Sequence, residues 1–532
     1  MLNKTNVWIF GLLLAALGWS GCAEEKDNNT TPPTPPEFEW VNEAGDRQFP
    51  SDFMWGTALA GFQADMGCPT LPAEECEDRN SDWYQYITAE ETLNSSNTFL
   101  SGDLPSSGPG YWELFDDDHT RAKETLNNNA LRLSIEWSRI FPTATDDAQT
   151  NEELAALADP KALAHYHAIF DSLKKHGLKP LVTLNHYSLP TWIHDGVGCH
   201  VDIENCSPRG WVDKDRTVKE IAKYAGFIAR EFGSKVDHWV TLNEPFAVAL
   251  PGYLFPTADR SNPPALLMQA EHARTVIIGL IEAHARMYDA VKADDTEDAD
   301  GDGENASVGV VYAMVPVVPK DPNNPLDVAA AENVYYLYNT IYLNGVAKGE
   351  LDHDFDGKPD FREDLANRMD YLGINYYSRI TVQGTEAAIL PELSPLTTFN
   401  PLTLEVWEVY PRGIYEMIKV AHEDYNLPVI ITENGVMDPT EKEATLGALI
   451  PTLSWMHQAM MEGADVGGYF YWTLVDNYEW NHGMQMRFGL YEVDIEDSAK
   501  SRTLRAFSSS YADIAGSNSI PASVQASYPT DG

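Results

Sequence analysis

Two glutamates stand directly after short apolar segments of the sequence, each next to an asparagine. Glu244 follows Trp-Val-Thr-Leu and Asn243, and Glu433 follows Ile-Ile-Thr and precedes Asn434. One such glutamate alone is more often a helix cap or a surface charge than a catalytic group. Two at one site can divide the work of glycoside hydrolysis, because one carboxyl protonates the departing oxygen while the other meets the developing cationic carbon. The pair is the leading candidate for chemistry in this sequence.

The motifs of other hydrolytic sites do not accompany these glutamates. The sequence has no His-Glu-x-x-His run or comparable ligand cluster beside them, which argues against a catalytic metal. It also has no Gly-x-Ser-x-Gly turn, which argues against a serine hydrolase. Trp472 and Trp480 offer flat apolar faces suited to a sugar ring, although either tryptophan alone is more often a core residue. These observations favour a carbohydrate substrate.

The elements that must hold the two glutamates alternate between short apolar segments and longer amphipathic ones. This alternation predicts parallel strands, and eight such units close into an α/β fold, a (β/α)8 TIM barrel of a single domain. A doubly wound open sheet is the alternative, but no glycine-rich phosphate loop follows the first strand. The predicted strands cover residues 53–62, 130–137, 179–186, 238–244, 307–314, 371–378, 429–434 and 468–475. The predicted helices include residues 161–177, 217–232, 266–291, 329–346, 411–425 and 444–463.

Polar and aromatic residues gather where the predicted strands end. In chain order these positions are Asn185-His186, Asn243-Glu244, Tyr376-Tyr377, Glu433-Asn434 and Trp472. The carboxyl ends of parallel barrel strands meet at one rim, which is where barrel enzymes hold their catalytic residues. We therefore expect Glu244, on the fourth strand, and Glu433, on the seventh, to converge on one mouth.

Length and charge limit the classes of function. The chain has 532 residues, 43% of them hydrophobic, so it can bury the core of one large barrel or of two domains. Its 81 acidic and 36 basic residues give a formal net charge of −45. This charge repels phosphate backbones and anionic membrane surfaces, so we expect no nucleic-acid partner. The sequence makes no prediction of oligomeric state.

The N-terminus is typical of an exported protein. Lys4 precedes an apolar run at 7–17 that is too short to span a bilayer. Small residues then precede Cys22, so we interpret residues 1–22 as a signal peptide with a lipobox-like end. Lipidation of Cys22 would be the only contact with a membrane, and because Trp19 is atypical there, simple secretory cleavage is the alternative. The predicted location is periplasmic or extracellular.

The rest of the chain divides into three predicted parts. Residues 23–48 are rich in proline and threonine and read as a flexible tether, 49–515 as the barrel domain, and 516–532 as a C-terminal tail. Four further cysteines occur in two close pairs, Cys68 with Cys76 and Cys199 with Cys206. In an exported protein such pairs predict local disulfides, and free buried thiols are the alternative.

Six segments in the same order resemble the family 1 glycoside hydrolases, the β-glucosidase and β-galactosidase group. The resemblance extends from Phe53 to Tyr511, nearly the whole mature chain. It implies a retaining, exo-acting β-glycosidase, with β-glucosidase as the favoured activity, that removes terminal nonreducing β-D-glycosyl residues from glycosides or oligosaccharides. It implies no cofactor for catalysis. The matching segments are 53–58, 132–139, 241–245, 373–377, 431–435, and 476–480 with 487–489.

The resemblance also implies roles for individual residues. Glu433 would be the nucleophile and Glu244 the acid/base, with Arg132 and Tyr377 holding the nucleophile ionised. Contacts to the sugar would come from Gln63, His186, Asn243, Asn375 and Glu479. The apolar surround of the sugar would be Trp472, Trp480 and Phe488, and Trp407 would be the platform for the aglycone.

Two positions depart from the family pattern. Tyr187 follows His186 where the family usually has tryptophan, and Gln63 is followed by Ala-Asp where Glu-Gly is usual. We expect neither departure to touch the catalytic pair, so both bear on specificity. The alternatives among enzymes are a transglycosidase and a 6-phospho-glycosidase, for which residues 481–486 offer few phosphate-binding groups. A sugar-binding lipoprotein that lost turnover is the alternative outside enzymes.

An acidic segment at 352–363 is a candidate for structural Ca²⁺. Its carboxylates are spaced as in an EF-hand loop, with glycine sixth and predicted helices at 335–346 and 363–369. A solvated acidic turn is the alternative, and Pro359 replaces the usual aliphatic residue. A weaker relative at 298–303 lacks the closing glutamate, and both segments should lie on the barrel face opposite the active site. The predicted ligands are Asp352, Asp354, Asp356, Asp360 and Glu363.

Overall fold

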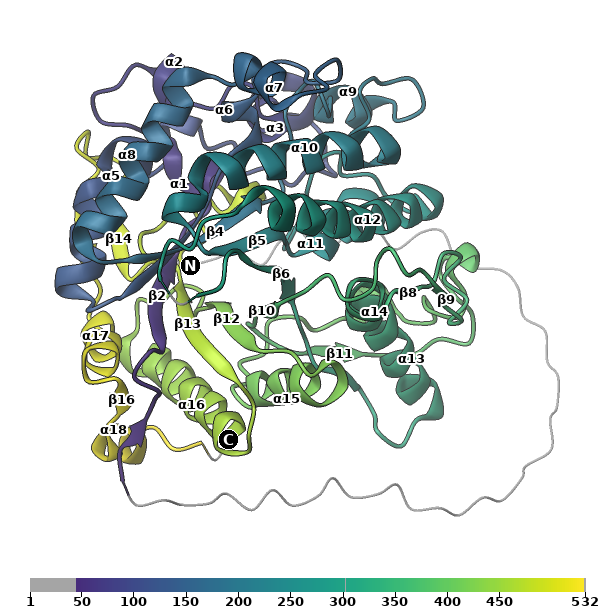
Figure 1. Ribbon diagram of the computed structural model, residues 1–532. Helices are drawn as coiled ribbons and strands as arrows, with labels where there is room; N and C mark the ends of the chain where they lie inside the picture. The colour runs from purple at the N-terminus through teal and green to yellow at the C-terminus, as the bar shows by residue number, and fades with distance from the viewer. Residues whose placement is uncertain (1–44, 302, 531–532) are drawn as a thin grey trace. The chain divides into compact units, whose positions relative to one another are not determined.

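The eight predicted strands all form, and they pair in parallel into a closed barrel (Figure 1). The computed structural model describes residues 45–301 and 303–530. The fold is therefore the predicted TIM barrel. Around the barrel the strands are β2 (Met54–Ala58), β3 (Ala130–Ser134), β4 (Lys179–Asn185), β5 (His238–Asn243), β6 (Ser307–Ala313), β10 (Tyr371–Asn375), β12 (Val429–Asn434) and β13 (Val466–Trp472), which pairs with β2.

The barrel interior is a packed core. Strands buried on both faces explain why the strand sequences are nearly continuous apolar runs. Gly56 leaves room for the ring of Phe470, because a Cβ atom at Gly56 would lie 2.4 Å from Phe470 Cδ1. The site must therefore lie at an end of the barrel. The core cluster includes Met54, Ala130, Leu181, Val240, Val311, Tyr371, Ile430 and Phe470.

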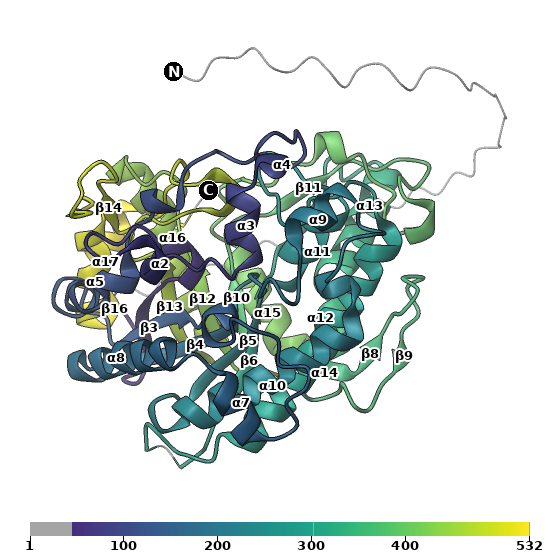
Figure 2. The same ribbon diagram turned by 90° about the horizontal axis from the view of Figure 1, so that it is seen from above.

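Helices surround the barrel, as the view from above shows (Figure 2). Local sequence explains where these helices begin and end, as the helix at Pro160–His176 shows. Pro160 occupies its first turn, and the side chain of Asp159 accepts from the backbone N–H groups of Lys161 and Ala162. Gly177 ends the helix with a φ of 66°. The main helices are α8 (Pro160–His176), α10 (Lys214–Phe232), α12 (Ala270–Asp294), α13 (Pro325–Tyr335), α14 (Ile341–Lys348), α15 (Gly413–Tyr425) and α16 (Lys442–Met461).

Two helices differ from their predicted ranges more than the others do. The helix predicted from residue 266 begins at Ala270, because Met268 has a φ of 61°, which a right-handed helix does not accommodate. The helix predicted at 329–346 forms as α13 and α14, separated by a π-helical turn at Tyr336–Thr340. Both differences follow from local backbone conformation, which hydrophobic periodicity does not encode.

The first and last described elements pair with each other. The short strand β1 (Arg47–Gln48) is antiparallel to β16 (Ser519–Ile520). Next to this pair, the indole Nε1 of Trp55 donates to Asn518 Oδ1 at 2.8 Å. The pairing thus extends past the predicted domain limits of 49 and 515, and the predicted tail contains β16 and α18 (Ala522–Ser527).

Several N-terminal predictions lie outside the described residues. They are the signal peptide at 1–22, the anchor at Cys22 and the tether up to residue 44. Within 45–301 and 303–530, no helix is both long enough and apolar enough to span a bilayer.

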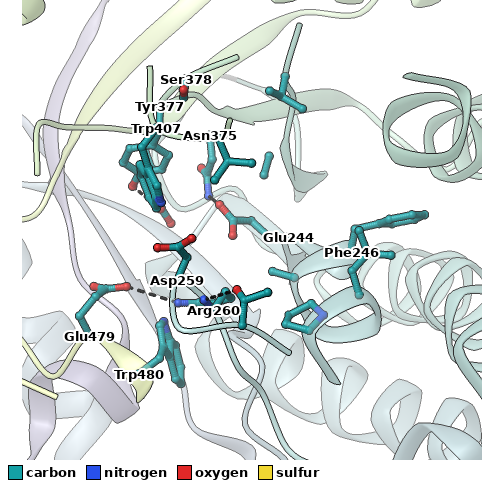
Figure 3. Close-up of a pocket in the computed structure, with 18 of the residues that line it drawn as sticks. Glu244, Phe246, Asp259, Arg260, Asn375, Tyr377, Ser378, Trp407, Glu479 and Trp480 are labelled. Atoms are coloured by element: carbon teal, nitrogen blue, oxygen red, sulfur yellow. Dashed lines mark hydrogen bonds and ion pairs between the residues drawn. The ribbon is translucent and has the colours of Figure 1, made fainter. Parts of the chain in front are cut away.

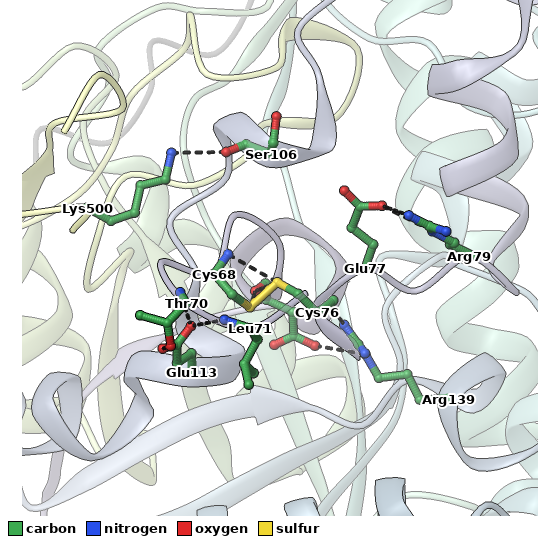
Figure 4. The surroundings of a disulfide bond; sticks show 11 residues. Cys68, Thr70, Leu71, Cys76, Glu77, Arg79, Ser106, Glu113, Arg139 and Lys500 are labelled. Carbon is green, nitrogen blue, oxygen red and sulfur yellow. Dashed lines mark hydrogen bonds and ion pairs between the residues drawn. A yellow bond between two sulfur atoms is a disulfide. The ribbon is translucent and has the colours of Figure 1, made fainter. Parts of the chain in front are cut away.

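Both predicted disulfides are present, Cys68–Cys76 and Cys199–Cys206. Arg139 lies beside the first of them and donates to the carbonyl of Cys76 at 2.7 Å (Figure 4). The same guanidinium forms an ion pair with Asp65, 3.2 Å from Nε to Oδ2. Asp65 ends the short helix α1 (Gly61–Asp65), which carries Gln63. The departure at Asp65 therefore has a structural partner, and this buried pair helps fix the position of Gln63.

Candidate active site

Glu244 and Glu433 stand at the carboxyl ends of barrel strands and line one cavity of about 400 Å³. Glu433 belongs to β12, and its carbonyl accepts from Tyr376 N at 2.9 Å. Glu244 follows β5 with a φ of 42°, and its N–H donates to Val311 O at 2.9 Å. The left-handed residue turns the chain from the strand into α11 (Pro245–Tyr253). The predicted convergence of the two glutamates is confirmed.

The carboxylate of Glu433 is held by a cation and a hydroxyl. Arg132 Nη1 lies 2.5 Å from Oε1, and Tyr377 OH donates to Oε2 at 2.8 Å. Arg132 is 1% exposed and also donates to Asn243 Oδ1 at 2.7 Å. The pKa of Glu433 is raised to about 7. Burial and the charge of Glu244 raise this pKa, and Arg132 offsets part of the rise. The Arg132 cation therefore favours the charged form of Glu433.

The carboxylate of Glu244 has a different set of partners. Asn375 Nδ2 donates to Glu244 Oε1 at 2.7 Å, and the hydroxyl of Tyr187 donates to Oε2. That hydroxyl also accepts from Asn243 Nδ2 at 3.0 Å. The expectation that the departure at Tyr187 leaves the catalytic pair untouched is therefore wrong. The hydroxyl at the end of the Tyr187 ring reaches the Glu244 carboxylate. The sequence pattern shows only that tyrosine replaces tryptophan here, and it does not show which group the tyrosine contacts.

All of the residues predicted to contact the sugar except Asn243 line the cavity. Gln63 Nε2 donates to Glu479 Oε2 at 2.9 Å. The imidazole of His186 is stacked against Trp472 at 6.0 Å and against Trp480 at 5.8 Å between ring centroids. A polar edge beside flat apolar rings suits a molecule with hydroxyls around an apolar ring face.

The remaining predicted residues are brought to the same place. Trp407 lies at the mouth, 43% exposed, and Tyr377, Asn375 and Phe488 also line the cavity (Figure 3). Arg132 and Asn243 are buried beneath the carboxylates instead of lining the cavity, and they reach it through Glu433, Tyr187 and Asn375. The cavity is also lined by the apolar residues Phe246, Leu250, Pro251 and Phe255.

Arg260 is a cavity residue that the sequence did not reveal. Its Nη1 lies 3.5 Å from Glu479 Oε1, and its guanidinium lies 5.2 Å from the ring centre of Tyr187 and 5.4 Å from that of Trp480. The pKa of Glu479 is raised to about 7, because burial raises it by more than Arg260 lowers it. Figure 3 shows the two side chains facing each other. Arg260 lies in a loop without periodic pattern, so only the folded structure reveals its position.

The predicted EF-hand at 352–363 is wrong in form. The strand β8 (Glu350–Leu351), just before the segment, pairs with β9 (Asp360–Phe361) near its end, so the segment forms a hairpin. Residues 363–367 form turns where a second helix was expected. Asn367 has a φ of 57°, which a helix does not accommodate. Carboxylate oxygens of Asp352, Asp354 and Asp356 lie within 4.8 Å of one another, but Asp360 and Glu363 are not in that group. Calcium binding here stays a prediction, with three carboxylates instead of five.

Known proteins are similar to this chain in sequence and in fold over most of its length. Residues 45–520 match the model of glycosyl hydrolase family 1. The β-galactosidase of Pyrococcus woesei is 38% identical over 84% of this chain and 93% of its own, and that of Sulfolobus acidocaldarius is 33% identical over 89% and 96%. The β-glycosidase structure from Thermosphaera aggregans has a TM-score of 0.76 at 31% identity, covering 90% of this chain and 99% of its own. The β-glucosidase structure from Pyrococcus furiosus has a TM-score of 0.75 at 32% identity, covering 91% and 98%.

Proposed function

The chain belongs to glycosyl hydrolase family 1, and we propose that it is a retaining, exo-acting β-glycosidase that favours β-glucosides and also cleaves β-galactosides. Its substrates are terminal nonreducing β-D-glycosyl residues of small glycosides or oligosaccharides. The proposal rests above all on one observation: the buried carboxyl of Glu433 and the half-buried carboxyl of Glu244 line one cavity, and the guanidinium of Arg132 is bound to Glu433.

In the proposed first step, the Glu433 carboxylate attacks the anomeric carbon. The glycosidic C–O bond breaks as Glu244 gives its proton to the departing oxygen, leaving a covalent glycosyl-enzyme. In the second step Glu244 takes a proton from water, whose oxygen attacks the same carbon and displaces Glu433. Two inversions at one carbon retain the β configuration. The ion pair with Arg132 supports this division of roles, because a cation favours the charged, nucleophilic form of Glu433.

The proposed sugar specificity rests on two polar residues that line the cavity. Glu479 and Gln63 present oxygen and nitrogen atoms at one end of the cavity, where hydroxyls of the terminal sugar would bind. A carboxylate that accepts hydrogen bonds discriminates weakly between the two epimers at O4. The names of the relatives, β-galactosidase and β-glucosidase, agree with this tolerance. Trp407 at the mouth would support the leaving group.

A panel of 4-nitrophenyl β-glycosides tests the function. We expect hydrolysis of the glucoside, galactoside and fucoside, with the highest kcat/KM on the glucoside and a β-configured first product by NMR. Strict preference for mannosides or 6-phosphorylated sugars would contradict the proposed specificity. Silence on every glycoside, with sugar binding retained in calorimetry, would favour a binding protein that lost turnover.

Replacing Arg260 with glutamine should impair use of the sugar in a pH-dependent way. Without this cation the pKa of Glu479 rises further above about 7, so less Glu479 is ionised and able to accept from sugar hydroxyls. We expect kcat/KM on the aryl glucoside to fall about tenfold at pH 7, equivalent to ~1.4 kcal/mol. The ratio of wild-type to variant activity should be larger at pH 6 than at pH 8.

Arg216→Gln is the matched control, because Arg216 forms an ion pair with Asp146 away from the cavity residues. It should leave the profile unchanged. A ratio for Arg260→Gln that is flat or grows with pH would contradict a role through the charge of Glu479.

We also propose export through residues 1–22 and lipid anchoring at Cys22. The two disulfides support export, since such bonds persist mainly in oxidising compartments. Mass spectrometry of the mature N-terminus from the native host should find a lipid-modified Cys22 in the membrane fraction. An unmodified N-terminus between residues 20 and 48 would contradict the anchor, and a cytosolic chain that retains residues 1–22 would contradict export.

A further inference from the structure

A second acidic cluster lies at the amino-terminal end of the barrel, away from the catalytic cavity. Asp237 directly precedes β5, and residues 295–306 connect α12 to β6 (Figure 1). The two segments are joined by backbone contacts: Ala299 N donates to Asp237 Oδ1 at 2.8 Å, and Ser307 N donates to Asp237 O at 2.7 Å. One carboxylate oxygen from each of Asp237, Asp298 and Asp300 lies within 4.8 Å of the other two.

Asp237 supplies an independent sign that a cation belongs in this cluster. The residue is only 6% exposed, and its Oδ2 has no hydrogen-bond partner among the described residues. A buried carboxylate oxygen without a donor is costly, because it has lost its hydration without replacement. Oδ1 of Asp237 accepts from Ala299 N, so the unmet need of this carboxylate lies at Oδ2.

Among the described residues, no lysine or arginine forms an ion pair with Asp237 or Asp298. Lys179 Nζ lies 3.2 Å from Asp300 Oδ2. Lys235, which lines the adjacent depression of about 270 Å³, is engaged with Asp171. Glu297 and Asp295 add further negative charge along the same connection. Several carboxylates close together repel one another unless a hard cation gathers their oxygens.

We propose that Asp237, Asp298 and Asp300 form a Ca²⁺ site that ties the start of β5 to the connection between α12 and β6. Ca²⁺ accepts six to eight oxygens in flexible geometry, so carbonyls and water can complete the shell on the exposed side of Asp298 and Asp300. Mg²⁺ fits less well, since it requires near-octahedral geometry and dehydrates reluctantly. Asp237 thus takes the place of the closing glutamate that the segment itself lacks. The site is independent of the proposed enzymatic function.

The proposal is tested on the whole mature chain, stripped with chelator and titrated with CaCl₂ alone. At Ca²⁺ about 100-fold above its Kd we expect the wild-type Tm to rise by about 2 to 3 °C for each site filled. Asp237→Asn should bind one Ca²⁺ fewer per chain, measured by equilibrium dialysis and elemental analysis, and should lose that part of the Tm rise. In chelator the same variant should be at least as stable as wild type, because the uncompensated charge is gone. MgCl₂ at the same concentration should have little effect.

Three further variants test whether Ca²⁺ binding depends on Asp237, Asp298 and Asp300 and not on other carboxylates. Asp298→Asn, at an exposed position, should also lose one Ca²⁺ and serves if Asp237→Asn folds poorly. Asp171→Asn removes a neighbouring carboxylate outside the cluster and should bind as wild type. Asp354→Ala changes the other acidic loop and should leave the Asp237-dependent ion in place. The proposal is overturned if Asp237→Asn and Asp298→Asn bind as much Ca²⁺ as wild type, if wild type binds none, or if Asp237→Asn lowers Tm equally with and without Ca²⁺.

Discussion

Glu433→Gln should abolish turnover of every aryl β-glycoside, lowering kcat by about 10⁴- to 10⁶-fold, the loss typical of removing a catalytic nucleophile. The amide has nearly the shape of the carboxylate, so its oxygen can still accept from Arg132, and the fold should persist. An amide does not attack the anomeric carbon, and no covalent intermediate forms. Rapid-mixing kinetics should therefore show no burst of nitrophenol, and intact mass spectrometry should show no glycosylated protein.

Glu416→Gln is the matched control, since Glu416 accepts from Tyr410 outside the cavity. This variant should keep wild-type kcat, while both variants should keep the wild-type Tm within a few degrees. If Glu433→Gln kept more than about one hundredth of the wild-type kcat, Glu433 would not be the nucleophile. A loss of kcat below about 100-fold is far smaller than removal of a nucleophile causes.

Glu244→Ala should separate the two half-reactions. A 2,4-dinitrophenyl leaving group needs no proton, so the glycosyl-enzyme should still form rapidly with that substrate and then accumulate. Water is activated poorly without the base, and we expect steady-state kcat to fall by about 10²- to 10⁴-fold. Glycosides with a poor leaving group should lose the first step as well.

External azide should restore the second step of Glu244→Ala, because this anion needs no general base and the truncated side chain leaves space beside Asn375 and Tyr187. The product should be a β-glycosyl azide, identified by NMR. An α-azide would contradict the covalent intermediate on Glu433. Unchanged activity of Glu244→Ala on unactivated disaccharides would show that another group is the acid/base.

The barrel and its two glutamates were predictable because their signals are local and repeated. Each strand is a short apolar run, and each catalytic candidate follows such a run, so Glu244 and Glu433 can be placed on one rim without knowing any contact. The positions of Gln63 and Glu479 came from the resemblance to a family, not from a physical pattern.

The parts that escaped prediction depend on contacts between distant segments. Arg260 meets Glu479 across 219 positions of sequence, and Tyr187 reaches Glu244 only after two strands pair. The acidic segment at 352–363 has EF-hand spacing, but pairing of Leu351 with Asp360 makes it a hairpin. Spacing records which residue types are available, while tertiary pairing decides which of them meet.

The pairing of β1 with β16 determines how the barrel can be held. Trp55 at the start of β2 contacts Asn518, so both ends of the described chain leave from the side where the barrel strands begin. The cavity opens where the strands end, at Glu244 and Glu433. A surface or support joined near residue 45, or beyond α18, would thus hold the enzyme by its base. Its mouth would face the surrounding medium, and long glycosides could diffuse in without passing the attachment.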